Sequence, residues 1–329
     1  MSKILVTGGA GYLGAVLVPK LLRSNHTVTV LDSFQHNVPS LAAVSRDRAL
    51  RMVRGDIVHE PGLFHRLAAE ADAVVHLAAI VGAPACSADP GLTTLTNQHA
   101  TEELVAHMCP DQTLIFPCTN SGYGKGGAAP MTEADPMTPL SIYGRTKVAA
   151  EAVVLRHPLG VSLRFGTLYG PSARMRLDLL VNDFVWYAAK KVAWRQGGVE
   201  IPLGIYEPGF RRCVLHVSDA AEAIVRALHR VRDLRGRPWN VGAENVTKAE
   251  LADRIAQQVP GFRWREASGR DPDQRDYVVS SDTFRTATGW APSVALNDGI
   301  AELLRLYQQP FDAFPSQWRN VPSAPRPAP

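Results

Sequence analysis

The segment TGGAGYLG, from Thr7 to Gly14, gives the clearest indication of the fold. It follows an apolar run that begins at Lys3 and precedes a segment with helical spacing. Glycines at such a place let the backbone turn sharply and let a pyrophosphate approach the N–H groups that begin the helix. The same glycines also suit an ordinary tight turn, so the weight of the pattern depends on the residues that come after it.

An acidic residue lies at the expected distance. Asp32 ends the next β-branched run, TVTVLD, 18 residues after Gly14. A carboxylate there reaches a ribose hydroxyl and repels a 2′-phosphate. No Arg or Lys follows Asp32 before Arg46, so the pattern predicts a site for NAD rather than NADP.

Strands alternate with helices through the first half of the chain. Apolar runs at TVTVLD, LRMVRGD, AVVHLAA and TLIFPC are separated by helical stretches, notably 90–108 and 141–156. This order predicts an α/β fold, a doubly wound parallel sheet with helices on both faces. We expect an NAD-binding domain over residues 1–170 and a smaller α+β lobe, interleaved with it, over 171–308. Residues 309–329 hold six prolines and predict a loosely packed or disordered tail.

The composition excludes several classes of protein. The 329 residues are 46% hydrophobic and 20% charged, with a net charge of +4 and no basic cluster, which argues against nucleic-acid binding. No apolar run approaches the roughly 20 residues of a membrane span, and the N-terminus lacks a signal-peptide layout, so we expect a cytoplasmic protein. The four cysteines form no C-x-x-C pair and are expected to be reduced. The ten histidines show no metal-ligand spacing, so no metal site is predicted.

A candidate alcohol-oxidising site lies between Cys118 and Lys147. Thr119 ends an apolar run, and Tyr143 and Lys147 are four positions apart in a helical segment, so they share a face. A nearby ammonium, together with a positive nicotinamide ring, would lower the pKa of the phenol, and Tyr143 could then accept a hydroxyl proton. Tyr-x-x-x-Lys alone is common, but it gains specificity when it follows a dinucleotide signature.

Other cofactor contacts are expected at the ends of the strands. Asp56, beside Ile57, could hold the adenine amino group or could be a turn residue. His76 ends the fourth strand and is interpreted as structural. The complete set of predicted cofactor contacts is Gly8, Gly11, Tyr12, Leu13, Gly14, Asp32, Asp56, Ile57, Leu77, Ala78, Ala79, Tyr143 and Lys147.

These ordered motifs resemble the extended short-chain dehydrogenase/reductase family of nucleotide-sugar epimerases and dehydratases. The resemblance covers roughly residues 3–308 and includes TGGAGYLG, Asp32, HLAA, YGRTK, LHVSDAAEAI and WNVG. It implies a Rossmann domain with a C-terminal substrate lobe, bound NAD, a nucleotide-diphosphate sugar as substrate, and a homodimer formed through a four-helix bundle.

A narrower resemblance concerns VGAPAC, TNSGYG, MRLDLLVNDF, DPDQRDY and TGWAP. Together these are similar to the GDP-heptose 4-dehydrogenases of bacterial capsule biosynthesis. The resemblance implies oxidation at C4 of a nucleotide-linked heptose, with tightly held NAD(H) and a 2-oxo acid such as 2-oxoglutarate as the final oxidant.

Guanidinium groups in the second half suit a diphosphate because they are always charged and donate in a fork. The family places an arginine ahead of the HV.D segment on the substrate diphosphate, which is Arg212 here, and another in the late loop, where Arg270 or Arg275 is the candidate. Each arginine could equally be a solvated surface charge. The complete set of predicted substrate contacts is Asn120, Ser121, Arg174, Arg176, Asn182, Arg212, Arg270 and Arg275.

Three reactions would begin with hydride loss from C4: 4-oxidation, 4-epimerisation and 4,6-dehydration. The resembling dehydratases carry an Asp-Glu pair directly after the threonine, where this chain has Asn120 and Ser121. Neither is an efficient base near neutral pH, so dehydration is disfavoured. A non-enzymatic NAD sensor would need the glycines and Asp32 but not Thr119, Tyr143 and Lys147, so it is disfavoured as well.

Overall fold

A seven-stranded parallel sheet forms the centre of the computed structural model, which describes residues 1–190, 202–271, 273–309 and 320. The strand order is β10-β6-β5-β4-β1-β2-β3, and every pairing is parallel. The strands are β1 (Lys3–Thr7), β2 (Thr27–Asp32), β3 (Leu50–Arg54), β4 (Ala73–His76), β5 (Thr113–Thr119), β6 (Gly160–Phe165) and β10 (Pro238–Val241). The prediction of a doubly wound parallel sheet is therefore confirmed.

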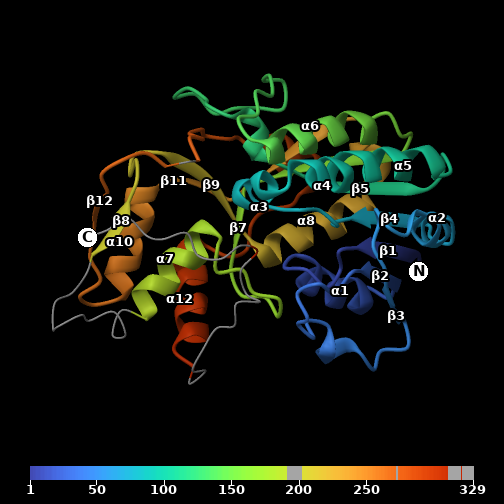
Figure 1. Ribbon diagram of the computed structural model, residues 1–329, viewed down its shortest axis with the longest axis horizontal. Coiled ribbons are helices and arrows are strands. Elements are labelled where there is room, and N and C mark those ends of the chain that lie inside the picture. The colour runs from blue at the N-terminus through green and yellow to red at the C-terminus, as the bar shows by residue number, and fades with distance from the viewer. Residues whose placement is uncertain (191–201, 272, 310–319, 321–329) are drawn as a thin grey trace.

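Helices cover both faces of this sheet, as Figure 1 shows. On one face α1 (Gly14–Arg23) packs against α8 (Val217–His229), and their apolar sides join one core cluster with the strands. On the other face α2 (Pro61–Ala69), α5 (Ala100–His107) and α6 (Ile142–Val154) enclose a second cluster. Because both faces are covered, β4 is buried along its whole length.

The second lobe has its own core, assembled from short strands and three helices. Its sheets are β11-β9-β7 and β12-β8. Its main helices α7, α10 and α12 gather at one end of the molecule in Figure 1. The bounds are β7 (Thr167–Tyr169), α7 (Leu180–Ala189), β8 (Leu203–Ile205), β9 (Arg211–His216), β11 (Glu244–Thr247), α10 (Lys248–Gln258), β12 (Trp264–Glu266) and α12 (Leu296–Tyr307).

The remaining helices are short. They are α3 (Ala83–Ala88), α4 (Pro90–Thr94), α9 (Val231–Leu234) and α11 (Asp282–Thr288). The helix predicted over 90–108 is divided, because a π-helical segment, Leu95–His99, lies between α4 and α5. A capping box opens α10, with Thr247 and Glu250 each bonding the other's backbone.

The sequence also led to expectations for the cysteines, for membrane-spanning helices and for the C-terminal tail. All four cysteines are free thiols. No described helix is long and apolar enough to cross a membrane. The predicted tail falls almost entirely outside the described residues, and Asn320 is its described member beyond Gln309.

Candidate active site

A cavity of about 400 Å³ lies at the carboxyl ends of the central strands. In a doubly wound sheet this is where ligands bind, since the loops there diverge to the two faces. The lining combines the glycine turn after β1, the end of β2, the segment after β4, the end of β5 and one side of α6. Residues from the second lobe, including Arg174 and Arg275, close it from the other side.

The glycine turn is packed so tightly that side chains are excluded. Gly8 has a φ of +67°, and a Cβ there would lie 2.7 Å from the backbone nitrogen of Ala78. A Cβ on Gly14 would lie 2.5 Å from the carbonyl oxygen of Gly9. The turn therefore runs directly beside the segment after β4, and Gly8, Gly11, Tyr12, Leu13 and Gly14 all line the cavity. Leu77, Ala78 and Ala79 line it as well.

Asp32 holds the glycine turn against the end of β2. One carboxylate oxygen accepts a hydrogen bond from the Ala10 amide at 2.9 Å, and the other accepts from the Phe34 amide at 2.8 Å. Burial raises the pKa of Asp32, although these two bonds oppose the shift. A carboxylate has about four acceptor sites, so Asp32 retains acceptor capacity for a ribose diol.

Asp56 and His76 have local partners. Asp56 lines the cavity beside Ile57, and its Oδ1 accepts hydrogen bonds from the amides of Val58 and His59, as a turn residue would. His76 is buried, and its Nδ1 lies 2.8 Å from the Thr7 hydroxyl. Burial, with the charge of Lys147, lowers the pKa of His76 to about 3, so the ring is neutral at physiological pH.

Thr119, Tyr143 and Lys147 meet at the far end of the same cavity. Thr119 ends β5, while Tyr143 and Lys147 lie on α6, whose N-terminus is capped by the Ser141 hydroxyl. The Lys147 ammonium sits 3.7 Å from the centre of the Phe116 ring, and burial lowers its pKa to about 8. Burial raises the pKa of Tyr143. The cations that oppose this shift are Arg176 and Arg275, rather than Lys147 as the sequence suggested.

The two residues after Thr119 have different surroundings. Ser121 lines the cavity, and its Oγ accepts a hydrogen bond from Thr119 at 2.9 Å and another from Arg275. Asn120 is fully buried and is absent from the described lining, and neither amide atom has a hydrogen-bond partner among the described residues. The loop therefore presents a serine bonded to arginine where the resembling dehydratases carry an Asp-Glu pair.

The predicted substrate residues divide into two groups. The residues that line the cavity are Ser121, Arg174, Arg176 and Arg275, and those absent from its described lining are Asn120, Asn182, Arg212 and Arg270. The Asn182 amide is buried, accepts from the Gly170 amide and donates to Tyr12 and Arg176. These bonds engage its amide within the protein, and its role as a substrate contact stays a prediction.

Arg212 and Arg270 differ in their surroundings. Arg212 is buried, donates to the carbonyl oxygens of Arg211, Asp273 and Arg275, and forms an ion pair with Asp273 at 3.3 Å. It therefore positions the loop that carries Arg275. Arg270 is exposed.

Sequence patterns missed some of the lining. His36, Tyr277 and Asn320 all face the cavity. Tyr277 lies two residues after Arg275 in the DPDQRDY motif, so the sequence had already indicated the segment that carries it. Nothing in the sequence around Asn320 marked it, because its contacts are with Arg174 and Val81, which are distant in the sequence.

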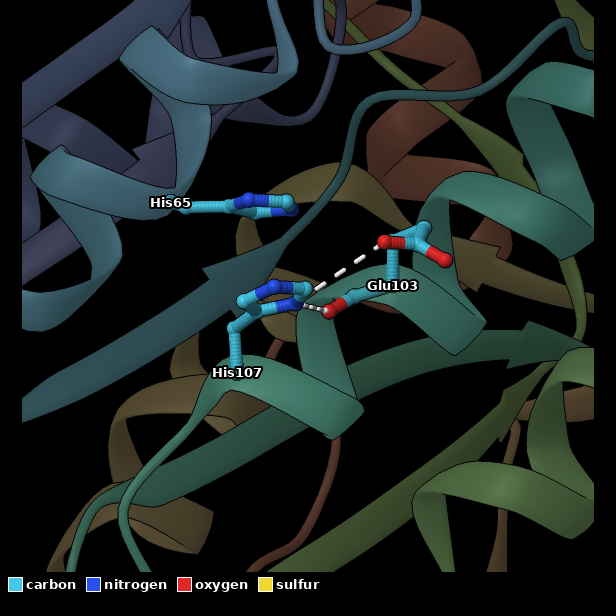
Figure 2. A group of neighbouring side chains, drawn as sticks. All are labelled: His65, Glu103 and His107. Atoms are coloured by element: carbon cyan, nitrogen blue, oxygen red, sulfur yellow. Dashed lines mark hydrogen bonds and ion pairs between the residues drawn. The ribbon is translucent and has the colours of Figure 1, made fainter.

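Among the described residues one cluster has the composition of a metal site. His65, Glu103 and His107 lie on α2 and α5, outside the cavity lining, with ligand atoms within 4.8 Å of one another. Figure 2 shows the two imidazoles stacked, with ring centres 3.8 Å apart and planes 14° from parallel. The lone pairs of nearly parallel rings lie in separate planes and do not converge on one ion, so we assign no metal to this cluster.

The residues of the cavity fit a dinucleotide. A pyrophosphate and a ribose require the groups found here: a glycine turn that a Cβ would block, an acidic residue at the end of β2, and the buried Arg174, whose Nε has no partner among the described residues. The part of the cavity lined by Tyr143 and Lys147 can then receive the nicotinamide ring of the dinucleotide.

Comparison with known proteins agrees with this geometry. The sequence pattern of the NAD dependent epimerase/dehydratase family matches residues 4–242. A dTDP-glucose 4,6-dehydratase of Streptomyces griseus is 30% identical over 324 residues, covering 93% of this chain and 94% of the relative. A UDP-glucose 4-epimerase of Corynebacterium glutamicum is 27% identical, covering 88% and 91%.

A solved structure extends the likeness to the fold. DesIV, the dTDP-glucose 4,6-dehydratase of Streptomyces venezuelae with NAD and TYD bound, superposes with a TM-score of 0.80 at 27% identity. The superposition covers 94% of this chain and 97% of that one.

Proposed function

Because the chain belongs to the NAD dependent epimerase/dehydratase family, we propose that it oxidises the C4 hydroxyl of a nucleotide-activated sugar to a 4-keto sugar. The observation that carries this proposal is the convergence of Thr119, Tyr143 and Lys147 on one cavity with the glycine turn. A protein that only binds NAD has no use for this second end of the cavity.

The residues at the two ends have separate tasks. Asp32 and the glycine turn hold the cofactor, and NAD⁺ supplies the hydride acceptor when bound. Tyr143 takes the proton of the sugar hydroxyl, while Thr119 holds the same oxygen by a hydrogen bond. Burial raises the pKa of Tyr143, so its phenolate depends on nearby cations, among which Arg176 and Arg275 already lower that pKa.

Dehydration after oxidation needs an acid and a base beside C5 and C6. Among the described residues the only carboxylates that line the cavity are Asp32 and Asp56. Both accept hydrogen bonds from backbone amides of the turns after β2 and β3, on the side predicted to hold the cofactor. The absence of a carboxylate beside Tyr143 in the described lining favours a reaction that stops at the ketone or returns the hydride.

Two observations support a proposal for the substrate class: the arginines that line the cavity, and the resemblance carried by MRLDLLVNDF and the four other motifs quoted with it. We propose a nucleotide-diphosphate sugar of the GDP-heptose kind, whose phosphates face the guanidinium groups of Arg176 and Arg275. A net oxidation needs an external acceptor, for which we propose a 2-oxo acid reduced to its 2-hydroxy acid. We also propose a homodimer through α5 and α6, which pack side by side on one face of the sheet.

The catalytic role of Tyr143 is tested by Tyr143→Phe, with Tyr206→Phe as the matched control outside the cavity lining. We expect Tyr143→Phe to lower the rate of NAD reduction by GDP-linked or UDP-linked sugars by about 10²–10⁴-fold, since a general base is lost. NAD affinity, measured by calorimetry, should stay within about threefold. Full activity in the variant would overturn the mechanism.

A 4-epimerase is the second candidate, favoured by the relative that carries this activity. The two reactions separate when purified enzyme is mixed with each nucleotide sugar and reduced cofactor is followed by absorbance. A 4-keto product that accumulates only with added 2-oxo acid supports the dehydrogenase. A C4-inverted sugar at constant cofactor redox state supports the epimerase instead.

A further inference from the structure

Arg174 is one of the largest fully buried side chains of the protein, with an exposed fraction of 1%. It lies in the loop between β7 and α7. Its Nη1 donates to the Met175 carbonyl at 3.1 Å, and its Nη2 donates to the Asn320 side-chain oxygen at 2.7 Å. Its Nε is buried and has no hydrogen-bond partner among the described residues.

No described carboxylate forms an ion pair with Arg174, unlike its neighbour. Arg176 is paired with Asp178 at 2.5 Å through two hydrogen bonds. Burial, together with the charge of Arg176, lowers the pKa of Arg174 to about 10, which still leaves it charged at neutral pH. A buried charge without a partner is costly, so this site calls for an anion that the described residues do not supply at ion-pair distance.

Arg174 lies where three cofactor-binding segments meet. Its loop is fastened to the glycine turn, because Ser172 donates to the Tyr12 carbonyl at 2.8 Å and the Tyr12 hydroxyl donates to the Gly170 carbonyl at 2.7 Å. Its charge bears on Asp32 at the end of β2. Through Asn320, whose amide donates to the Val81 carbonyl at 3.3 Å, it also reaches the segment after β4.

We propose that Arg174 binds the pyrophosphate of NAD, opposite the backbone amides of the glycine turn. Those amides contribute only dipoles, whereas a pyrophosphate carries two negative charges. The other Lys and Arg side chains of the described lining are Arg176, Arg275 and Lys147. Asp178 and Asp273 neutralise the two arginines, and Lys147 lies beside Tyr143 on α6.

This assignment moves Arg174 from the predicted substrate contacts to the cofactor. It also makes cofactor retention depend on the second lobe, because the glycine turn and Arg174 come from segments about 160 residues apart in the sequence. An arginine fork donates two parallel bonds to phosphate oxygens, and the free Nε is one of the donors that such a fork uses.

The test compares Arg174→Met with Arg54→Met, which removes the same charge from an exposed position at the end of β3, outside the cavity lining. Calorimetry of the cofactor-free proteins would measure binding of NAD, ADP-ribose, adenosine, UDP and GDP. For Arg174→Met we expect NAD and ADP-ribose to bind about 10- to 100-fold more weakly, as for loss of charge-assisted bonds. Adenosine, which lacks phosphate, should bind as before, and Arg54→Met should change each affinity less than about twofold.

A second readout separates a ligand role from a structural one. Without cofactor, Arg174→Met should unfold at the same temperature as the wild type or higher, because an unpaired buried charge is gone. If that variant fails to fold, Arg174→Gln keeps a donor for Asn320 and is expected to show the same loss for NAD and ADP-ribose.

Three results would overturn the assignment. One is NAD binding by the folded variants within twofold of the wild type. Another is an equal loss for adenosine and NAD. The third is a loss confined to UDP and GDP, which would place Arg174 on the substrate diphosphate.

Discussion

Two arginines of this protein are almost equally buried, yet their surroundings are opposite. Arg164 on β6 is 5% exposed, and its Nε and Nη2 donate to both oxygens of Glu151 while its Nη1 donates to Tyr123. Arg174 is 1% exposed and meets no carboxylate at ion-pair distance in the described chain. The Glu151 pair gives Arg164 a structural role, whereas a buried charge that meets no anion among the described residues indicates a ligand.

The Arg164 pair also explains how the catalytic helix is held. Glu151 is on α6, two turns after Tyr143 and one turn after Lys147, and it accepts a further bond from Ser162 at 2.6 Å. The pair therefore fastens α6 to β6, and Tyr123 links it to the turn that follows Thr119. The strand β5 and the helix α6 carry the proposed catalytic residues, whereas the proposed cofactor contact, Arg174, lies in a loop.

The largest effect on stability is expected when Glu151 is removed. Arg164 is then a buried charge without a carboxylate, like Arg174, but it has no proposed ligand to replace the lost partner. Glu151→Ala should lower the free energy of unfolding by about 3–5 kcal/mol, because a buried charge loses its partner. Urea unfolding measures this. Glu222→Ala, on the exposed side of α8, should cost less than about 1 kcal/mol. Equal losses in the two variants would contradict the contrast between the two arginines.

Asp273 provides an intermediate case, since it neutralises Arg275 and Arg212 beside the cavity. Burial alone would raise the pKa of Asp273, but the bonds and charge of Arg275, with Arg212, outweigh burial and hold the pKa well below its usual range. Its folded-state pKa is depressed, so its stabilisation is complete above the unfolded value of about 3.9 and is lost as the pH falls further.

Asp273→Asn should therefore cost about 2 kcal/mol of stability at pH 7 and much less near pH 2. Urea unfolding across this pH range measures the difference. Asp111→Asn, an exposed control, should leave the pH dependence of the wild type unchanged. A constant cost for Asp273→Asn at every pH would show that the charge of this carboxylate is not what stabilises the loop.

Lys147 adds a third kind of buried cation, because it can lose its proton whereas an arginine cannot. Burial lowers its pKa to about 8, so the cavity that Tyr143 also lines loses this cation above that pH. We expect kcat to fall about tenfold per pH unit above pH 8. Lys147→Arg should be slower at neutral pH but should lack this decline, and a decline at the same pH in both proteins would assign it to another group.

The smallest effect concerns Ser121, which links Arg275 to Thr119. Ser121→Ala removes two hydrogen bonds and should lower kcat about fivefold, in line with roughly 1 kcal/mol for a positioning contact. Steady-state kinetics measures this, and Ser280→Ala, outside the cavity lining, is the control. A loss above about a thousandfold would mean that Ser121 takes part in proton transfer.

Local patterns predicted much of the cofactor half. The turn from Gly8 to Gly14, Asp32 and the Tyr143–Lys147 pair each depend on residues within one strand, turn or helix, and the cavity receives all of them. The Thr247 capping box was predictable for the same reason. The contacts of Asn182 with Tyr12 and Gly170 could not be predicted, because its sequence neighbours reveal neither.

The order of residues was enough to specify the doubly wound sheet, the NAD signature and the candidate groups for oxidising an alcohol. These follow from periodicity, turn chemistry and spacing along one element. Folding alone established which charges are neutralised: Glu151 reaches Arg164, Asp273 reaches Arg275, and Arg174 receives no carboxylate from the described chain. Burial and pairing of a charge depend on segments that are distant in the sequence, so the proposed role of Arg174 could not be derived without their arrangement in space.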